Sequence, residues 1–323
     1  MNFSPEPPLL FSSTAHPALS QEIARLYGAV LSECIVGRFP DGEIKAQVGV
    51  NVRGRDVYVI GPTNATPTAA ADNLMELCIL ADAMRRASAA RITAVMSYFG
   101  YGRADRKDDS RKPITARLVT HLLEESGVDR FIAIDLHSRQ IQGFTDLPFD
   151  NLHAGPVLRA HIRTLGLDRL YIVGADTGAG PMARKWGQLL SVSSTAADKV
   201  RKGDDDVEIR EIRGDLEGMD AVIIDDESST GVTAVRVAEF LKEQRNVRSV
   251  RLAVVHPKFV SGAIDRITSS PIQHVITSNT VPTGILPDQF TVCSVAQLLA
   301  AGIRGTYEQS SLSDLFEEQM SAA

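Results

Sequence analysis

The stretch Ala221–Thr233, AVIIDDESSTGVT, decides the fold. Its first four residues are apolar and predict a buried strand of a parallel sheet, since both faces of such a strand are covered. Asp225 and Asp226 stand where that strand is expected to end, and Ala234–Glu243 then has helical apolar spacing. Backbone N–H groups at a helix start can hold a phosphate, and two carboxylates can hold sugar hydroxyls or a divalent cation. An ordinary strand-to-helix turn with two capping Asp residues is the alternative interpretation.

Outward from this stretch, strands and helices alternate along the whole chain. Short apolar runs predict strands at 56–61, 91–98, 130–135, 169–175, 190–193, 221–224 and 249–255. Amphipathic runs predict helices at 17–27, 72–87, 116–126, 156–165, 181–188 and 234–243. Such alternation is typical of parallel, doubly wound α/β sheets, and loop-like residues near 150–155 predict a break between two comparable sets. The charged stretch Val200–Arg213 is expected to form an exposed hairpin or a flap.

The composition indicates a globular protein and argues against nucleic acid as a ligand. The chain has 323 residues, enough for about two domains, with 44% hydrophobic and 23% charged residues, as in ordinary globular proteins. A net charge of −6 argues against a nucleic-acid partner. Cys34, Cys78 and Cys293 lack metal or redox spacing, so we expect reduced thiols and a cytoplasmic location. The N-terminal stretch lacks the features of a signal peptide, and no apolar run is long enough for a membrane span.

Three further segments place polar groups where strands are expected to end. Tyr98–Lys107, YFGYGRADRK, offers aromatic rings to a base and Arg side chains to phosphates. Asp135 and His137 follow another strand, and they are either a satisfied core pair or a carboxylate beside an exposed metal ligand. Asp176 precedes the Gly-rich turn TGAG, which suits a diphosphate and its magnesium.

Taken together, the motifs identify a family. The segments FPDGE (39–43), SYFGYGRADRK (97–107), IDLHSRQIQGF (134–144), DKVR (198–201), DDESSTGVT (225–233) and SLSDLF (311–316) occur in one order. From about residue 8 to residue 317 the chain resembles the ribose-phosphate diphosphokinases. The resemblance implies two phosphoribosyltransferase-type (Rossmann-like) domains, at 1–150 and 151–305, with a C-terminal segment, 306–323, that packs back on the first.

The resemblance also implies the site residues, the ligands and the reaction. ATP and ribose 5-phosphate would be the substrates, Mg²⁺ the cofactor, and a homo-hexamer the assembly. The anomeric hydroxyl of ribose 5-phosphate would attack the β-phosphorus of ATP, which gives 5-phosphoribosyl 1-diphosphate and AMP. The implied ATP contacts are Arg103, Asp108 and His137, with Phe39, Asp41 and Glu43 from a neighbouring subunit; the magnesium ligands are His137 and Asp176; the catalytic residues are Lys199 and Arg201; the ribose-5-phosphate contacts are Asp225, Asp226, Ser228, Ser229, Thr230, Gly231 and Thr233; and the site for phosphate or ADP as regulators is Arg53, Ser311 and Ser313.

Several positions depart from the family pattern. Ala104 replaces a Gln beside the nucleotide, Val200 replaces an Arg of the flap, and Asn51 replaces a Ser near the regulatory site. Ser229 replaces an Asp and Val232 a Gly in the sugar loop, where a β-branched residue resists any positive φ. These changes leave open a diphosphokinase with another ribosyl acceptor, or a regulatory paralogue without activity. A phosphoribosyltransferase that consumes the diphosphate ranks last, because FPDGE and YFGYGRADRK have no role there.

Overall fold

The computed structural model describes residues 6–65, 68–201, 207–260 and 262–316, which form two compact units. The first unit runs to His153, and Thr280–Pro282 and the segment from Val295 onward return to it. The second comprises Ala154–Asn279 and Thr283–Ser294. The chain therefore changes unit within the expected break at 150–155, but it returns to the first unit at Val295, before the residue 306 expected from the resemblance.

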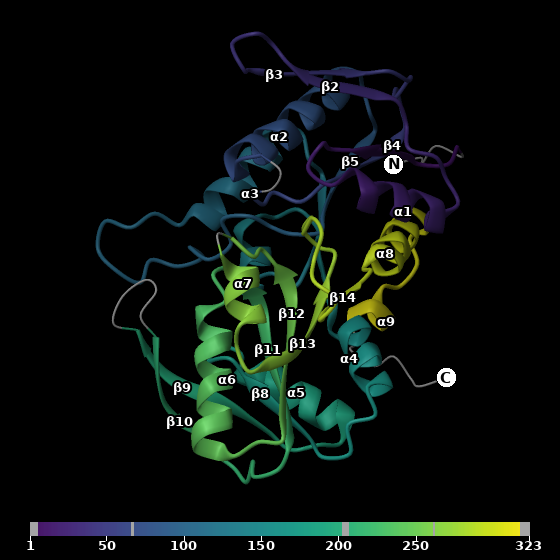
Figure 1. Cartoon of the computed structure of the whole chain (residues 1–323). Helices are drawn as coiled ribbons and strands as arrows, with labels where there is room; N and C mark the ends of the chain where they lie inside the picture. The colour runs from purple at the N-terminus through teal and green to yellow at the C-terminus, as the bar shows by residue number, and fades with distance from the viewer. Residues whose placement is uncertain (1–5, 66–67, 202–206, 261, 317–323) are drawn as a thin grey trace. The chain divides into compact units, whose positions relative to one another are not determined.

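The first unit contains a five-stranded parallel sheet in the order β1-β4-β5-β6-β7. Its strands are β1 (Leu9–Ser12), β4 (Asp56–Ile60), β5 (Arg91–Met96), β6 (Arg130–Ile134) and β7 (Phe149–Leu152). Its helices are α1 (Pro17–Tyr27), α2 (Ala70–Arg86), α3 (Thr115–Glu125), the 3₁₀ turn η1 (Arg139–Phe144), α8 (Ala296–Glu308) and α9 (Ser313–Phe316). β2 (Cys34–Arg38) and β3 (Ile44–Val48) form a separate antiparallel hairpin. β3 contacts α2, and Figure 1 shows the hairpin beside that helix.

Successive side chains of a strand point to opposite faces of this sheet, and both faces are buried. Val57 and Val59 of β4 pack in one hydrophobic cluster with Leu77 of α2. Tyr58, which lies between them, points to the other face, where its hydroxyl is 3.1 Å from the Thr306 hydroxyl of α8. The strand is buried along its whole length, as an apolar run in a parallel sheet predicts.

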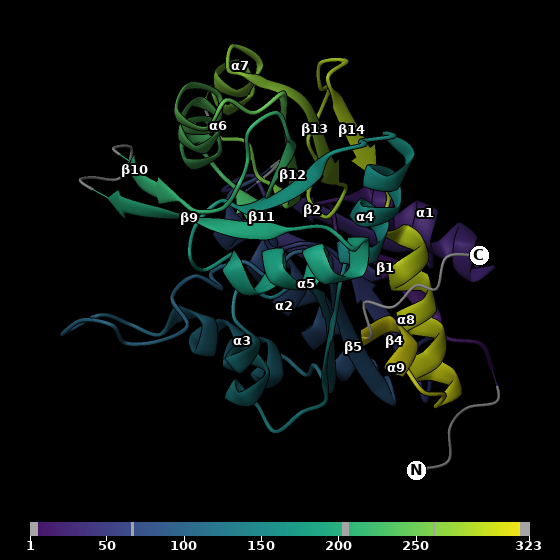
Figure 2. The same ribbon diagram turned by 90° about the horizontal axis from the view of Figure 1, so that it is seen from below.

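The second unit contains a seven-stranded sheet in the order β10-β9-β8-β11-β12-β13-β14, parallel except for the β9–β10 hairpin. Its strands are β8 (Leu170–Gly174), β9 (Ser194–Arg201), β10 (Val207–Ile212), β11 (Asp220–Ser228), β12 (Ser249–Pro257), β13 (Ile272–Ser278) and β14 (Phe290–Cys293). Its helices are α4 (Gly155–Thr164), α5 (Gly180–Leu190), α6 (Val232–Arg245) and α7 (Ala263–Thr268). Figure 2 shows α6 and α7 on one face of this sheet and α5 on the other, which is the doubly wound arrangement.

The structure corrects two expectations about this unit. Leu190–Ser193 is not a strand: Leu190 ends α5, Ser191 is its left-handed C-cap, and β9 begins only at Ser194. The strand at 221–224 is longer than expected, because β11 continues through Asp225 and Asp226 to Ser228 and stays paired with β12 up to Pro257. The expected hairpin at Val200–Arg213 is present as β9 and β10, and its residues 202–206 lie outside the described part of the chain. Within the described residues, no helix combines the length and the hydropathy needed to cross a membrane.

Candidate active site

Three adjacent strands of the second unit bring Asp176, Lys199 and Asp225 to one edge of the sheet. Gly174 of β8 pairs with Ile224 of β11 on one side and with Ala196 of β9 on the other. Asp176 follows β8, Asp225 is the next residue of β11, and Lys199 lies three residues further along β9. This is the carboxyl edge of the parallel strands, where open α/β sheets bind their ligands.

Lys199 joins two segments that the sequence analysis assigned to different ligands. Its Nζ lies 2.8 Å from Asp176 Oδ2 and 3.5 Å from the Oγ1 of Thr233. Its side chain is only 12% exposed, so the ammonium group is well shielded from water. Burial alone raises the pKa of Asp176, but the hydrogen bond and charge of Lys199 and the Ala179 N–H outweigh it and hold that pKa below its usual value.

Asp225 and Asp226 place negative charge close to this ion pair. Burial, followed by the charges of Asp226 and Asp176, raises the pKa of Asp225 well above its usual value, and Lys199 partly opposes the shift. An arrangement of carboxylates that repel one another favours a bound cation, and their oxygens are the ligands that Mg²⁺ prefers. The donor set at this edge therefore fits a divalent cation.

The loop after β11 shows how Val232 is accommodated. Gly231 adopts the left-handed conformation, with φ +74°, and is the N-cap of α6. Val232 is the first residue of the helix, so the β-branched side chain does not have to adopt a positive φ. The N–H groups of the first helical turn have no partner within the helix, which suits an anion at this position.

A cavity of about 490 Å³ in the first unit collects three of the residues expected at the nucleotide. Arg103, Asp108 and His137 all line it. Its remaining lining residues are Ala104, Asp105, Arg106, Lys112, Pro113 and Ser138. Three of these nine side chains are basic and two are acidic, which suits an anionic ligand.

The same cavity shows what the sequence analysis missed. Lys112 was not predicted to contribute, although it lies only four residues after Asp108, to which its Nζ is 3.5 Å distant. Gln140 Nε2 donates to Asp105 Oδ2 at 2.7 Å and thereby ties η1 to the YFGYGRADRK segment. The spacing of four residues was the available signal for Lys112, whereas the Gln140 contact joins segments 35 residues apart.

The structure also decides between the two interpretations of Asp135 and His137. His137 is exposed in the cavity, so it is not part of a buried core pair. Asp135 contacts His153, whose Nδ1 lies 2.6 Å from Asp135 Oδ1.

The expected contacts from the 39–43 turn lie at the tip of the β2–β3 hairpin. Phe39 N donates to the Glu43 carbonyl at 2.8 Å, and Glu43 N donates to Asp41 Oδ1 at 3.1 Å. Phe39 is 49% exposed, and Lys45 Nζ lies 5.7 Å from the centre of its ring. Arg38 of the hairpin forms an ion pair of 2.9 Å with Asp72 of α2, so the tip is fixed to the body of the unit.

The remaining predicted residues are less completely described. Arg53 donates to the Ser88 hydroxyl at 3.2 Å, whereas Ser311 donates to the hydroxyl of Ser313 at 2.8 Å. In the described part of the chain no contact joins Arg53 to these serines. Arg201 ends β9, and its side chain lies outside the description.

The two predicted magnesium ligands belong to different units, His137 to the first and Asp176 to the second. Across the residues that the structure describes, no group of three or more His, Cys, Asp or Glu side chains is already arranged around a metal position. Each ligand is consequently assessed within its own unit: His137 in the basic cavity and Asp176 beside the carboxylates of β11.

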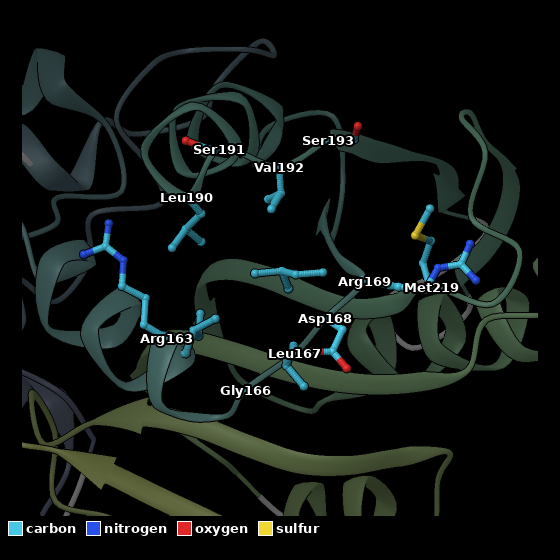
Figure 3. Close-up of a pocket in the computed structure, with 12 residues that line it drawn as sticks. Arg163, Gly166, Leu167, Asp168, Arg169, Leu190, Ser191, Val192, Ser193 and Met219 are labelled. Carbon is cyan, nitrogen blue, oxygen red and sulfur yellow. The ribbon is translucent and has the colours of Figure 1, made fainter.

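A second pocket, of about 640 Å³, lies at the opposite edge of the second sheet. Leu170 begins β8, Met219 precedes β11 and Ser193 precedes β9, and all three line this pocket. Figure 3 shows it with Arg163 and Arg169 on different sides. Asp176 and Asp225 do not line it, because they lie at the carboxyl end of the same strands.

Comparison with known proteins relates both units to one family. Residues 9–127 match the N-terminal domain of ribose phosphate pyrophosphokinase, and residues 190–317 match the phosphoribosyl synthetase-associated domain. The ribose-phosphate pyrophosphokinase of Shewanella oneidensis is 44% identical over 314 residues, which are 95% of this chain and 98% of that protein. The chloroplastic ribose-phosphate pyrophosphokinase 2 of Arabidopsis thaliana is 42% identical over 95% of this chain and 77% of that protein. The crystal structure of phosphoribosylpyrophosphate synthetase from Mycobacterium smegmatis superposes with a TM-score of 0.88 at 33% identity, covering 94% of this chain and all of that chain (100%).

Proposed function

The chain belongs to the ribose-phosphate pyrophosphokinase family, and we propose that it transfers the β,γ-diphosphoryl group of ATP to the anomeric hydroxyl of ribose 5-phosphate. It is a transferase of the kinase type that serves nucleotide biosynthesis by making 5-phosphoribosyl 1-diphosphate. The observation that carries the residue assignment is the position of Lys199, which contacts both Asp176 and Thr233.

Each substrate is assigned to one unit. The cavity with Arg103, Asp108 and His137 takes the nucleotide, because its basic side chains can pair with phosphate oxygens. In the second unit, Asp225 and Asp226 hold the ribose hydroxyls, and residues 228–233 hold the 5-phosphate at the start of α6. Phe39, Asp41 and Glu43 complete the nucleotide site of a neighbouring subunit in a homo-oligomer, which we propose to be a hexamer.

Charge determines how the residues act on the reacting groups. The oxygen of the anomeric hydroxyl forms a bond to the β-phosphorus and gives up its proton to solvent. The bond from that phosphorus to the α,β-bridging oxygen breaks, and AMP leaves with the bonding electrons on that oxygen. Such a transfer needs in-line positioning and the neutralisation of negative charge that spreads over the phosphoryl oxygens. Lys199 supplies a shielded positive charge for this purpose, with Arg201 as its partner at the end of β9.

Magnesium fits the donor set of this chain. Asp176, with Asp225 and Asp226 nearby, offers oxygen ligands in a region of excess negative charge, and His137 offers a ring nitrogen in the nucleotide cavity. When bound, Mg²⁺ would neutralise the diphosphate oxygens of ATP. Arg53, Ser311 and Ser313 are proposed to bind inorganic phosphate or ADP as regulators, and the cytoplasmic location stays a prediction.

The test is AMP release from ATP and Mg²⁺, measured with and without ribose 5-phosphate and with and without inorganic phosphate. AMP formation that depends on ribose 5-phosphate is expected, and a further increase with inorganic phosphate would support the regulatory assignment. ATP binding without AMP release would instead favour another ribosyl acceptor or a regulatory subunit. The conformation of Val232 speaks against the first of these, since the residue fits its helical position without backbone strain.

A further inference from the structure

The turn between β6 and η1 is held by the residues at the end of β7. Asp135 N donates to the Leu152 carbonyl at 2.9 Å, and Leu136 N donates to Asn151 Oδ1 at 3.0 Å. His153, the residue after β7, lies with its Nδ1 2.6 Å from Asp135 Oδ1. Two backbone N–H groups and one carboxylate of the turn are thus satisfied from a single neighbouring strand end.

The turn needs this support because its backbone is strained. Asp135 has φ +39°, in the left-handed region that costs a residue with a side chain about 1–2 kcal/mol. Such a conformation persists only where its surroundings fix it. The contacts are sheltered from water: Asn151 is 4% exposed, and the side chains of His153 and Asp135 are 14% and 17% exposed.

The His153 contact fixes the direction of the Asp135 side chain as well as its backbone. A carboxylate can only accept a hydrogen bond, so Nδ1 of His153 is the donor, and a bond to a charged acceptor is roughly twice as strong as one between neutral groups. Rotation of Asp135 back to a negative φ would pull its carboxylate away from His153. It would also redirect the chain at Leu136 and His137.

We propose that His153 is a positioning residue for the nucleotide cavity. His153 holds Asp135 in its left-handed conformation. This conformation directs His137, two residues further along the chain, into the cavity that Arg103 and Arg106 also line. The inference rests on the proposed function only in assigning this cavity to Mg-ATP. It gives a binding role to a residue that does not itself line the cavity.

The test compares three variants at one position. His153→Ala removes the donor, His153→Phe removes the donor but keeps a ring, and His153→Asn keeps an N–H donor at the same position on the side chain. His274→Ala is the matched control, since His274 is also partly buried and its ring nitrogen contacts a side-chain oxygen, Thr291 Oγ1, at 2.9 Å in the second unit. The readouts are Mg-ATP binding by calorimetry without ribose 5-phosphate, KM values for both substrates, and hydrogen exchange of the peptide that contains Leu136.

We expect His153→Ala and His153→Phe to bind Mg-ATP about tenfold more weakly. The Leu136 amide should exchange faster in both, while the KM for ribose 5-phosphate stays near that of the wild type. His153→Asn and His274→Ala should resemble the wild type in all three readouts. If His153→Ala does not fold, His153→Phe and His153→Asn still give the comparison.

Wild-type affinity in the Ala and Phe variants, or equal losses in the Ala and Asn variants, would overturn the proposal. So would parallel losses for both substrates, because these would indicate a general loss of structure. A wild-type chain that binds Mg-ATP but releases no AMP would refute the proposed reaction alone, since the binding comparison would still report on His153. A wild-type chain that binds no Mg-ATP would refute both.

Discussion

Replacement of Lys199 by methionine tests the centre of the proposed mechanism. The change keeps an unbranched side chain and removes the charge 2.8 Å from Asp176. Loss of one positioned group that neutralises transition-state charge costs about 10²–10³-fold in kcat, or roughly 3–4 kcal/mol. We therefore expect kcat to fall by about 10³-fold, with a much smaller change in the KM for ATP, because the nucleotide cavity is built from other residues.

The same substitution also affects stability. A fully buried ion pair costs about 3–5 kcal/mol when one partner is removed, and an exposed pair costs about 0–1 kcal/mol. The side chains of Lys199 and Asp176 are 12% and 29% exposed, so a loss of about 2 kcal/mol in the free energy of unfolding is expected. This loss leaves most molecules folded, and the effect on kcat can be measured.

Arg248→Met is the matched control. It removes the cation that contacts Asp220. Asp220 is buried and is the first residue of β11, the strand that also carries Asp225. Arg248→Met should lower stability and keep kcat within about threefold of the wild type. The assays are AMP release at saturating substrates and unfolding in urea. A kcat for Lys199→Met near the wild-type value, or an equal loss of kcat in the control, would refute the role given to Lys199.

Three further predictions concern the loops and the ion pair. Gly100→Ala should destabilise by about 3 kcal/mol, because its Cβ would lie 2.1 Å from the Thr63 carbonyl oxygen; an unchanged urea midpoint would contradict this. Gly231→Ala should cost about 1–2 kcal/mol through its φ of +74° and raise the KM for ribose 5-phosphate, and an unaltered KM would argue against the phosphate loop. The folded-state pKa of Asp176 lies below its reference value of 3.8, so its contribution to stability is present above that pH and is lost as the pH falls through the folded pKa. In Lys199→Met the burial of Asp176 is no longer outweighed, so this acid-dependent loss of stability should shrink or disappear. The free energy of unfolding in urea, measured for both proteins at several acidic pH values, would show the difference.

Much of the fold could be predicted from local patterns. The apolar run at 56–61 predicted β4 and the amphipathic run at 17–27 predicted α1, because burial on two faces or on one stripe leaves a direct trace in the sequence. The predicted strand at 190–193 was wrong, because this prediction also relied on a local apolar pattern alone. A short apolar run cannot be distinguished from the end of an amphipathic helix, and Leu190 is the last residue of α5.

The candidate site was predicted in part. The resemblance implied Arg103, Asp108 and His137 as nucleotide contacts, which stays a prediction, and the structure places all three at one cavity. Lys112, which lines the same cavity, was missed, although its spacing of four residues from Asp108 was an available signal. The contact between Asp135 and His153 was beyond a local pattern, because His153 approaches Asp135 only when β7 pairs with β6.

The sequence by itself determined the fold class and the family, because alternating periodicity and long ordered motifs are local properties of the chain. Only the tertiary structure decided which side chains meet. It placed Lys199 between Asp176 and Thr233, assigned the positive φ to Gly231 and not to Val232, and returned α8 to the first unit, where Thr306 contacts Tyr58. The contacts of Lys199 and of Thr306 depend on strand order and register, which bring together residues tens to hundreds of positions apart, and no local pattern records such contacts.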